Sequence, residues 1–320
     1  MLCEGLLSRL GAARRRPISV IDAQRARLPD GRWHFQHGPI DIVIGAEGVA
    51  AAVEAAHEAA WARFSTVLTD LVAELPLLRQ PVLAHASANP LRGDVARRMW
   101  ATCAPLVADA AGFITPMAAV AGAVAQTLVV AYQRPGVMRA WVNNGGDIAL
   151  HLAPGSSARV GLFADLSRFD GEALQRTTTG TLRTDAGFVV RADNPVRGVA
   201  TSGWRGRSLS RGIADSVTVL AAHAAMADAA ATVIANAVNL ADRAILRRPA
   251  NQVRDDSDLG EILVTVDVPA LSPDRLEQAL QQGVSVAHRL QARGLVHAVL
   301  LVCQGSLARL DALPALELVQ

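Results

Sequence analysis

The sequence predicts an α+β fold in which hairpins of antiparallel strands alternate with long helices. Strand-like segments come mostly in pairs joined by turn residues, as at Gly38-Pro39 and Asn144-Gly145. Long helical segments stand between these pairs rather than after every strand, which distinguishes the pattern from a doubly wound α/β sheet. A helix beside a strand pair occurs in both halves of the chain, which suggests a duplicated unit.

The composition fits a large domain with an aliphatic core. Of 320 residues, 51% are hydrophobic and only 4% are aromatic, so Ala, Val and Leu must fill the core. The net charge of +2 favours no particular partner, and nucleic-acid binding is not expected. All 31 basic residues are arginines, which excludes Schiff-base enzymes, Walker-type loops and lysine-dependent kinases. Arginine, backbone amides or a metal would hold any phosphate.

The cysteines and the amino-terminal residues predict a cytoplasmic protein. The three cysteines are far apart and form no CxxC pair, which indicates a reducing compartment and no zinc site. Residues 1–17 contain no continuous apolar stretch of the kind found in signal peptides. Residues 110–132 are uncharged and long enough to span a bilayer, but Thr115-Pro116 is a helix start inside them. We therefore expect a buried core helix and no membrane contact.

Residues 1–28 are expected to form a tail, and residues 29–320 a single domain with two pseudo-repeated halves. In the first half, Trp33, Phe35 and His37 alternate with polar residues, which is typical of a half-buried strand. The predicted elements of this half are a hairpin over 31–45, helices over 47–75, 93–105 and 116–133, and a hairpin over 138–152.

The second half centres on a strand and a helix that follow a loop. The loop over 198–215 contains small polar residues and arginines. On the predicted strand Ser216–Ala221, Val217, Val219 and Ala221 share one face, and an alanine-rich helix follows over 224–238. The other predicted elements are strands over 157–164, 179–184, 188–191, 261–268 and 296–303, and a helix over 272–293.

Two side chains on the predicted helix 224–238 are candidate metal ligands. Asp228 and Thr232 are four residues apart, so they lie on the same helical face. A carboxylate beside a hydroxyl on an apolar helix has two explanations. The pair caps a local backbone group, or it presents two hard oxygens to a magnesium ion.

The turn Asn144-Gly145-Gly146-Asp147 is a candidate ligand site. Asn-Gly is a strong hairpin signal, so a simple turn is the default interpretation. Bare glycine amides also let a ligand approach the backbone closely, and Asp147 could receive its hydroxyls or amine.

Two further segments could bind phosphate. Thr115 opens the core helix, and a helix start carries unpaired amides and a positive dipole end. In the run from Thr201 to Ser208, Arg205 and Arg207 could clamp a pyrophosphate, and Trp204 could stack on a planar ring. An exposed loop is the alternative for this run. No Gly-x-Ser-x-Gly elbow is present, so serine hydrolase chemistry is not expected.

The order of these motifs resembles the ApbE superfamily, the FAD:protein FMN transferases. The segments TPMAAVAGAVA, VNNGGDIALHL, ATSGWRGRSLSRGIADSVTV and ADAAATVIANAV are most similar to an uncharacterised ApbE-like subgroup. The resemblance implies duplicated T-fold-type units of antiparallel sheet with packed helices, and a flavin-nucleotide pocket between the halves. It also implies that Asp228 and Thr232 bind Mg²⁺. The predicted nucleotide-binding residues are Thr115, Asn144, Gly145, Gly146, Asp147, Thr201, Ser202, Gly203 and Arg205.

The sequence departs from the true transferases at two positions. They carry Lys-Gly where this chain has Ala121-Gly122, and a His-x-x-Asp-Pro motif where Arg207 stands. An arginine cannot act as a base, so the transfer chemistry of this chain is expected to be altered or lost. Arg207 and Ser208 are its predicted catalytic residues.

The resemblance implies a magnesium-dependent enzyme that cleaves FAD or transfers FMN to a protein hydroxyl. The expected partners are a flavin nucleotide and an acceptor protein, and the sheet edges permit a homodimer. One alternative is a non-catalytic flavin-binding, cofactor-binding or assembly protein that has lost the family's Lys and His. Another is an enzyme that uses the same pocket for an unrelated substrate.

Overall fold

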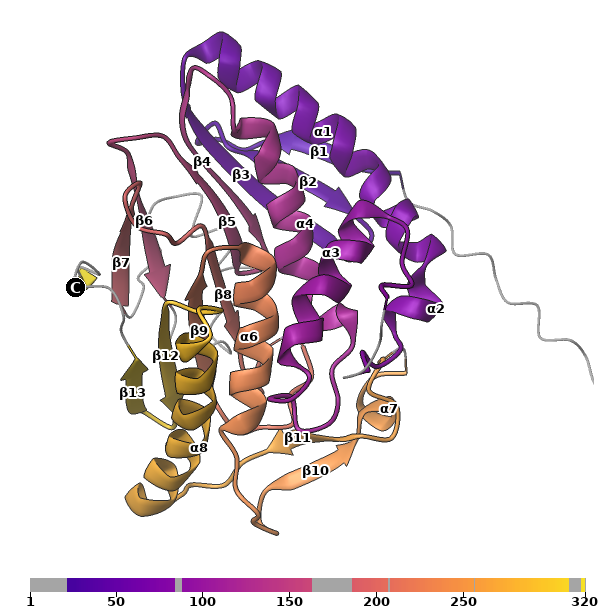
Figure 1. Ribbon diagram of the computed structural model, residues 1–320, viewed down its shortest axis with the longest axis vertical. Helices are drawn as coiled ribbons and strands as arrows, with labels where there is room; N and C mark the ends of the chain where they lie inside the picture. The colour runs from indigo at the N-terminus through magenta and orange to yellow at the C-terminus, as the bar shows by residue number, and fades with distance from the viewer. Residues whose placement is uncertain are drawn as a thin grey trace, which may run out of the picture.

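The fold is built on a nine-stranded sheet in which every neighbouring pair of strands is antiparallel. The strand order is β1-β2-β3-β4-β5-β8-β9-β12-β13. The long helices cover one face of this sheet, and a smaller sheet of order β14-β7-β6 lies on the other side (Figure 1). The computed structural model describes residues 22–83, 88–162, 186–206, 208–255, 257–310 and 318–319. The α+β prediction is confirmed.

The first half contributes the strands from β1 to β5. Trp33, Phe35 and His37 alternate along β2 as predicted, and Phe35 and His37 are buried. The elements are β1 (Gln24–Arg27), β2 (Trp33–His37), β3 (Ile40–Gly48), α1 (Ala50–Ala73), α2 (Leu75–Leu78), α3 (Asp94–Cys103), η1 (Ala104–Leu106), η2 (Pro116–Ala119), α4 (Val120–Val129), η3 (Val130–Tyr132), β4 (Val137–Asn144) and β5 (Asp147–Leu152).

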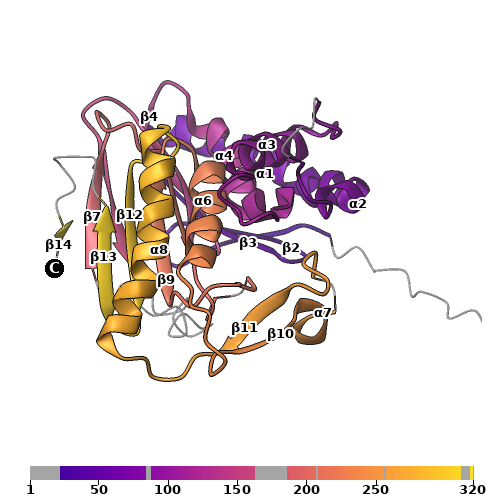
Figure 2. The same ribbon diagram turned by 60° about the horizontal axis from the view of Figure 1, so that its bottom comes forward.

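The second half also places helices between strand pairs of the large sheet, and it contains in addition the pairs β6–β7 and β10–β11. Its elements are β6 (Ser157–Leu162), β7 (Ala186–Arg191), β8 (Gly198–Ser202), β9 (Ser216–Ala221), α6 (Ala224–Ala237), β10 (Leu246–Pro249), α7 (Ala250–Val253), β11 (Leu263–Asp267), α8 (Pro273–Ala292), β12 (Ala298–Cys303), β13 (Ser306–Leu310) and β14 (Leu318–Val319). Figure 2 shows α6 and α8 side by side over β9 and β12. That the two halves are copies of one unit within a single domain stays a prediction.

The two faces of the large sheet carry separate hydrophobic cores. On β9, Val217, Val219 and Ala221 belong to the core beneath the helices. Leu220 belongs to the core shared with β6 and β7. The predicted division of this strand into two faces is therefore confirmed. Both faces are buried, as alternating side chains of a central strand require.

The two halves join through a short strand pairing and a close helix contact. β5 pairs with β8 at Ile148 with Val199 and at Ala149 with Gly198, and the Leu150 N–H donates to the Arg197 carbonyl just before β8 at 2.9 Å. Above this pairing, α4 packs on the start of α6, and a Cβ atom on Gly122 would lie 2.3 Å from the carbonyl oxygen of Ala224. Such a distance is far below van der Waals contact, so only glycine fits at position 122.

Four predictions about the elements need correction. Residues 24–27 form edge strand β1, although they were assigned to the tail predicted for 1–28. Residues 198–202 form central strand β8, although a loop was predicted. The helix predicted from Glu47 begins at Ala50, because β3 continues to Gly48. The strands β10, β13 and β14 were not predicted. The strand predicted over 179–184 lies outside the described residues.

The uncharged segment over 110–132 does not form one long helix. It contains a turn region, the 3₁₀ helix η2, the ten-residue helix α4 and the 3₁₀ helix η3. Within the described ranges, no helix has the length and hydropathy that a bilayer crossing requires.

A buried histidine predicts a pH dependence of folding stability. His57 is 3% exposed, and its Nδ1 atom lies 2.7 Å from the Tyr132 hydroxyl. Burial lowers the pKa of His57 below its ordinary 6.5. In the unfolded chain His57 therefore takes up a proton at about pH 6.5, whereas in the folded protein it does so only at lower pH. The free energy of unfolding decreases as the pH falls from the unfolded pKa to the lower folded pKa. One such group changes the free energy of unfolding by at most about 1.4 kcal/mol per pH unit.

We expect His57→Gln to flatten the decline in the free energy of unfolding between pH 7.5 and 5.5. Urea titrations at several pH values measure this slope. His288→Gln, on the exposed side of α8, is the matched control and should retain the wild-type slope. Equal slopes in all three proteins would contradict the assignment to His57.

Candidate functional site

A cavity of about 240 Å³ lies where the two halves of the large sheet meet. The β4–β5 turn, the end of β8 with its following loop, and the helices α4 and α6 contribute its walls. Ten of its twelve lining residues are ones that the sequence predicts as site residues. The lining consists of Ala121, Asn144, Gly145, Asp147, Thr201, Ser202, Gly203, Arg205, Gly206, Ser208, Asp228 and Thr232.

Asp228 and Thr232 stand one turn apart on α6 and both face the cavity. The Asp228 Oδ2 atom accepts a hydrogen bond of 2.9 Å from the Gly122 N–H in the first turn of α4. A carboxylate at a helix amino terminus satisfies an orphan donor and opposes the positive dipole end. Of the two explanations offered for this pair, the cap is present. The metal role stays a prediction.

Asp228 is held where a negative charge is costly. Burial raises the pKa of its carboxyl well above the ordinary value, and the Asp147 carboxylate raises it further. Backbone hydrogen bonds from Gly122 and Ala121 oppose this shift. The side chain is half-buried by surface area because it faces the cavity, while protein atoms surround the carboxyl on its other sides. Two acids thus face one recess.

The predicted hairpin turn is present, and its two central residues are Gly145 and Gly146, because Asn144 pairs with Asp147 as the last residue of β4. Gly145 and Gly146 have φ values of +67° and +113°, which L-residues rarely adopt. The Gly146 N–H donates to the Asn143 side chain at 2.8 Å, and Asn144 donates from Nδ2 to the Ala121 carbonyl at 3.1 Å. Asn144 therefore ties the turn to α4. Gly146 serves the turn and does not line the cavity.

The loop after β8 brings its hydroxyls and one arginine to the cavity. The Thr201 and Thr218 hydroxyls are 2.9 Å apart and hydrogen-bonded. Ser208 is exposed and lines the cavity, whereas Arg207 lies outside the described residues. Trp204 is not among the lining residues, and the Arg205 guanidinium lies 4.9 Å from its ring centre, so the stacking of a ligand ring on Trp204 stays a prediction.

Thr115 does not line the cavity. It is 2% exposed, and its hydroxyl donates to Asp258 Oδ2 at 2.5 Å. The bond ties the start of η2 to the loop before β11. The phosphate site predicted at this helix start is therefore separate from the residues that the cavity brings together.

The cavity offers few side chains that could bind a metal ion. Among the residues that the structure describes, no group of three or more His, Cys, Asp or Glu side chains is placed to hold a metal ion. Asp147 and Asp228 are the acids in the lining, together with the hydroxyls of Thr201, Ser202, Ser208 and Thr232. A cation here would need oxygen ligands from the backbone, water or a bound substrate in addition.

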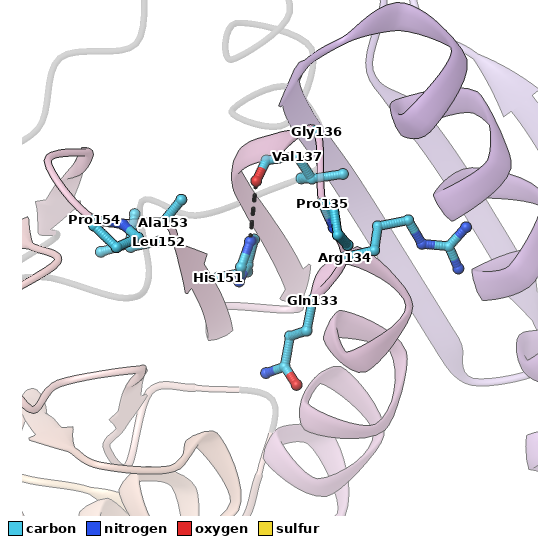
Figure 3. Close-up of a pocket in the computed structure, with 9 residues that line it drawn as sticks. All are labelled: Gln133, Arg134, Pro135, Gly136, Val137, His151, Leu152, Ala153 and Pro154. Atoms are coloured by element: carbon cyan, nitrogen blue, oxygen red, sulfur yellow. Dashed lines mark hydrogen bonds between the residues drawn. The ribbon is translucent and has the colours of Figure 1, made fainter.

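A larger hollow of about 490 Å³ lies at the far end of β4 and β5. Figure 3 shows its lining, with Arg134 turned away from His151. The His151 Nε2 atom lies 3.3 Å from the Val137 carbonyl oxygen. None of the predicted site residues lines this hollow, and few polar side chains converge on it. The smaller cavity is the better candidate site, because convergent polar groups rather than volume mark a binding site.

Three residues of the site region were not predicted. Ala121 and Gly206 line the cavity through positions that carry no functional side chain. Asp215, immediately before β9, accepts hydrogen bonds from Trp204 Nε1 at 3.3 Å and from the Gln304 N–H at 2.5 Å. The one indication of Asp215 in the sequence is that it is an acidic residue immediately before a predicted strand.

The fold is similar to the ApbE protein of Thermotoga maritima and to the flavinyl transferase ApbE of Pseudomonas stutzeri in its apo form. Each has a TM-score of 0.46 and 13% identity over 90% of this chain, covering 96% and 94% of the respective solved chains.

Curated relatives are similar at higher identity. A UPF0280 protein of Methanospirillum hungatei is 38% identical over 136 residues, which are 42% of this chain and 50% of that protein. In Methanothermobacter thermautotrophicus, a UPF0280 protein is 40% identical over 39% of this chain and 43% of its own length. The chain thus spans about half the length of these two relatives. A UPF0280 protein of Methanosarcina barkeri is 31% identical over 72% of this chain and 81% of its own length. A family model described as AbpE bacteria matches residues 25–309.

Proposed function

The chain belongs to the family described as AbpE bacteria, and from this premise we propose that it acts on a flavin nucleotide in the cavity between its two halves. The resemblance to ApbE-like proteins is confirmed by the family match. The proposed reaction is the magnesium-dependent cleavage of FAD, in which FMN passes to water or to the hydroxyl of an acceptor protein and AMP leaves.

The observation that carries this proposal is the pair of carboxylates facing one cavity. Asp228 is half-buried beside Asp147, and no histidine is found with them among the described residues of the lining. Mg²⁺ is commonly held by one or two carboxylates together with substrate phosphates, and this donor set fits it. Asp228 and Thr232 would hold the ion. When bound, Mg²⁺ would neutralise charge on the diphosphate.

The other cavity residues would bind and orient the nucleotide. Arg205 supplies a cationic group suited to phosphate oxygens, and the hydroxyls of Ser202 and Ser208 supply donors. A volume of about 240 Å³ is small for a whole dinucleotide, since pockets for drug-sized ligands start at about 300 Å³. We therefore place the diphosphate in the cavity and the remaining groups outside it.

The reaction breaks the bond between the FMN phosphorus and the bridging oxygen, which leaves with AMP. The acceptor oxygen forms the new bond to phosphorus and gives up its proton. Arg207 stands about where the family's His falls and cannot accept that proton. We assign the proton to a carboxylate oxygen of Asp147, the second acid in the lining.

We expect the purified full-length protein to release AMP from FAD in the presence of Mg²⁺ and to stop when EDTA is added. Flavin fluorescence and product chromatography measure this turnover. AMP release that continues unchanged in EDTA would contradict the role of the metal. No flavin binding at all would contradict the proposal as a whole.

A flavin carrier is the second candidate function. It is favoured by Ala121, which lines the cavity where true transferases carry Lys, and by Arg207 in place of their His. Tight FAD binding without turnover, with or without Mg²⁺, would support the carrier. A cytoplasmic location, an acceptor protein and a homodimer stay predictions.

A further inference from the structure

The loop between β8 and β9 presents two large side chains at the tip of a tight turn. The Gly206 N–H donates to the Gly203 carbonyl at 3.1 Å, so Trp204 and Arg205 occupy the two central positions. The Trp204 N–H donates to the Ala214 carbonyl at 3.0 Å, which ties this turn to the chain before β9. A Cβ atom on Gly203 would lie 2.2 Å from the Asp215 carbonyl oxygen, so the approach requires glycine.

Asp215 holds the same turn through its side chain. Its side chain is 12% exposed, and its Oδ1 atom accepts from Trp204 Nε1 at 3.3 Å and lies 3.6 Å from Arg205 Nε. Its Oδ2 atom accepts from the Gln304 N–H between β12 and β13 at 2.5 Å. The carboxylate thus connects the turn to the far edge of the sheet.

The Arg205 guanidinium is therefore held from two sides. Its face lies 4.9 Å from the centre of the Trp204 ring, and its Nε edge is turned to Asp215. The side chain is 39% exposed and lines the cavity. Among the described lining residues it carries the one cationic side chain. A fixed planar guanidinium suits a phosphate, since less freedom is lost on binding.

We propose that Asp215 and Trp204 are positioning residues that fix Arg205 as the phosphate-recognition group of this cavity. The site then takes a nucleotide diphosphate and discriminates against the same ligand without phosphates. The proposal rests on the proposed function and assigns a role to Asp215, which does not line the cavity itself. The same lining carries Asp147 and Asp228, which would hold a cation, so the anion would be bound by that cation and by Arg205 together.

The test measures binding of FAD, inorganic pyrophosphate and riboflavin in the presence of Mg²⁺. Arg205→Gln should weaken binding of FAD and pyrophosphate by about 10- to 100-fold, the loss expected for a charge-assisted hydrogen bond. Riboflavin binding should not change. Arg205→Lys should recover part of the loss, because it keeps the charge without the stacked planar fork.

The role of Asp215 is tested by a double-mutant cycle. Asp215→Ala should weaken binding of both phosphate ligands about as much as Arg205→Gln, and the double variant should lose no more than either alone. Thermal unfolding checks that each variant folds. If Asp215→Ala does not fold, Trp204→Leu removes the ring beneath Arg205 and should give the same selective loss.

The inference would be overturned if the affinity losses of Arg205→Gln and Asp215→Ala added up in the double variant. Equal affinity losses for riboflavin and FAD would overturn it as well. Wild-type affinity of Arg205→Gln for FAD and pyrophosphate would also overturn it. Its failure can be told from that of the proposed function. FAD that is cleaved and bound normally by Asp215→Ala and Trp204→Leu, but not by Arg205→Gln, refutes only the positioning proposal. Pyrophosphate binding that depends on Arg205, without any FAD turnover, refutes only the proposed function.

Discussion

Asp228→Asn is expected to lower magnesium-dependent FAD turnover by at least about 100-fold while the protein stays folded. A bound metal contributes several kcal/mol of stabilisation to a charged transition state, and each 1.36 kcal/mol is tenfold in rate. The asparagine oxygen can still accept the hydrogen bond that the Gly122 N–H donates at 2.9 Å. The substitution therefore removes the charge and keeps the cap. Steady-state AMP release over a Mg²⁺ titration measures the effect.

The control for this variant is Asp267→Asn, which removes an exposed acid from β11. It should retain wild-type turnover and the same Mg²⁺ requirement. Unchanged turnover in Asp228→Asn would show that the carboxylate only caps α4. A parallel loss in turnover and thermal stability would point to the same structural role, so both quantities are needed.

Gly122→Ala is expected to lower the free energy of unfolding by about 3 kcal/mol, the upper part of the range for overpacking a rigid core. The added Cβ atom would lie 2.3 Å from the Ala224 carbonyl oxygen and 2.9 Å from the Ala225 Cα atom. Both are backbone atoms of α6, so no side-chain rotation relieves the clash. The helices would have to separate, and the contact between Gly122 and Asp228 would open. Urea unfolding measures the change.

Gly93→Ala is the matched control for this substitution. The one short contact of its Cβ atom would be with the Glu74 Oε1 atom at 2.9 Å, the far end of a flexible side chain, and the Ala96 Cβ atom would lie at an ordinary 3.8 Å. We expect a change of less than about 1 kcal/mol, since a glycine at a helix start is replaced by alanine at modest cost. Equal destabilisation in both variants would contradict the assignment of the effect to the α4–α6 contact, because the lower unfolded-state entropy of alanine by itself favours folding.

Long elements with a clear period could be predicted from the sequence. Strand Ser216–Ala221 has the predicted bounds, and helix α8 differs from its prediction by a single residue at each end. Strand β8 was missed because Gly198 and its small neighbours show no strand pattern. A Cβ atom at Gly198 would lie 2.3 Å from the Ala224 backbone nitrogen, so helix packing rather than strand propensity selects this glycine.

The candidate site was predictable where its residues are close in sequence. Asp228 and Thr232 share a helical face by spacing alone, and the Asn144-Gly145 signal located the β4–β5 hairpin, although the two central residues of its turn are Gly145 and Gly146. Contacts between distant segments were not predictable. Thr115 pairs with Asp258, 143 residues away, rather than with the cavity. Asp215 acquires its role only when Gln304, 89 residues away, lies beside it.

The short pairing between β5 and β8 has a consequence for cohesion between the two halves of the molecule. Ile148 pairs with Val199 and Ala149 with Gly198, and one more backbone hydrogen bond, from the Leu150 N–H to the Arg197 carbonyl, continues the contact just before β8. The cavity spans this junction, with Asp147 on one side and Thr201 on the other. A ligand that binds both sides adds its binding free energy to the resistance against opening there. Amide hydrogen exchange along β5 and β8 should therefore slow when the site is filled, more than exchange within either half.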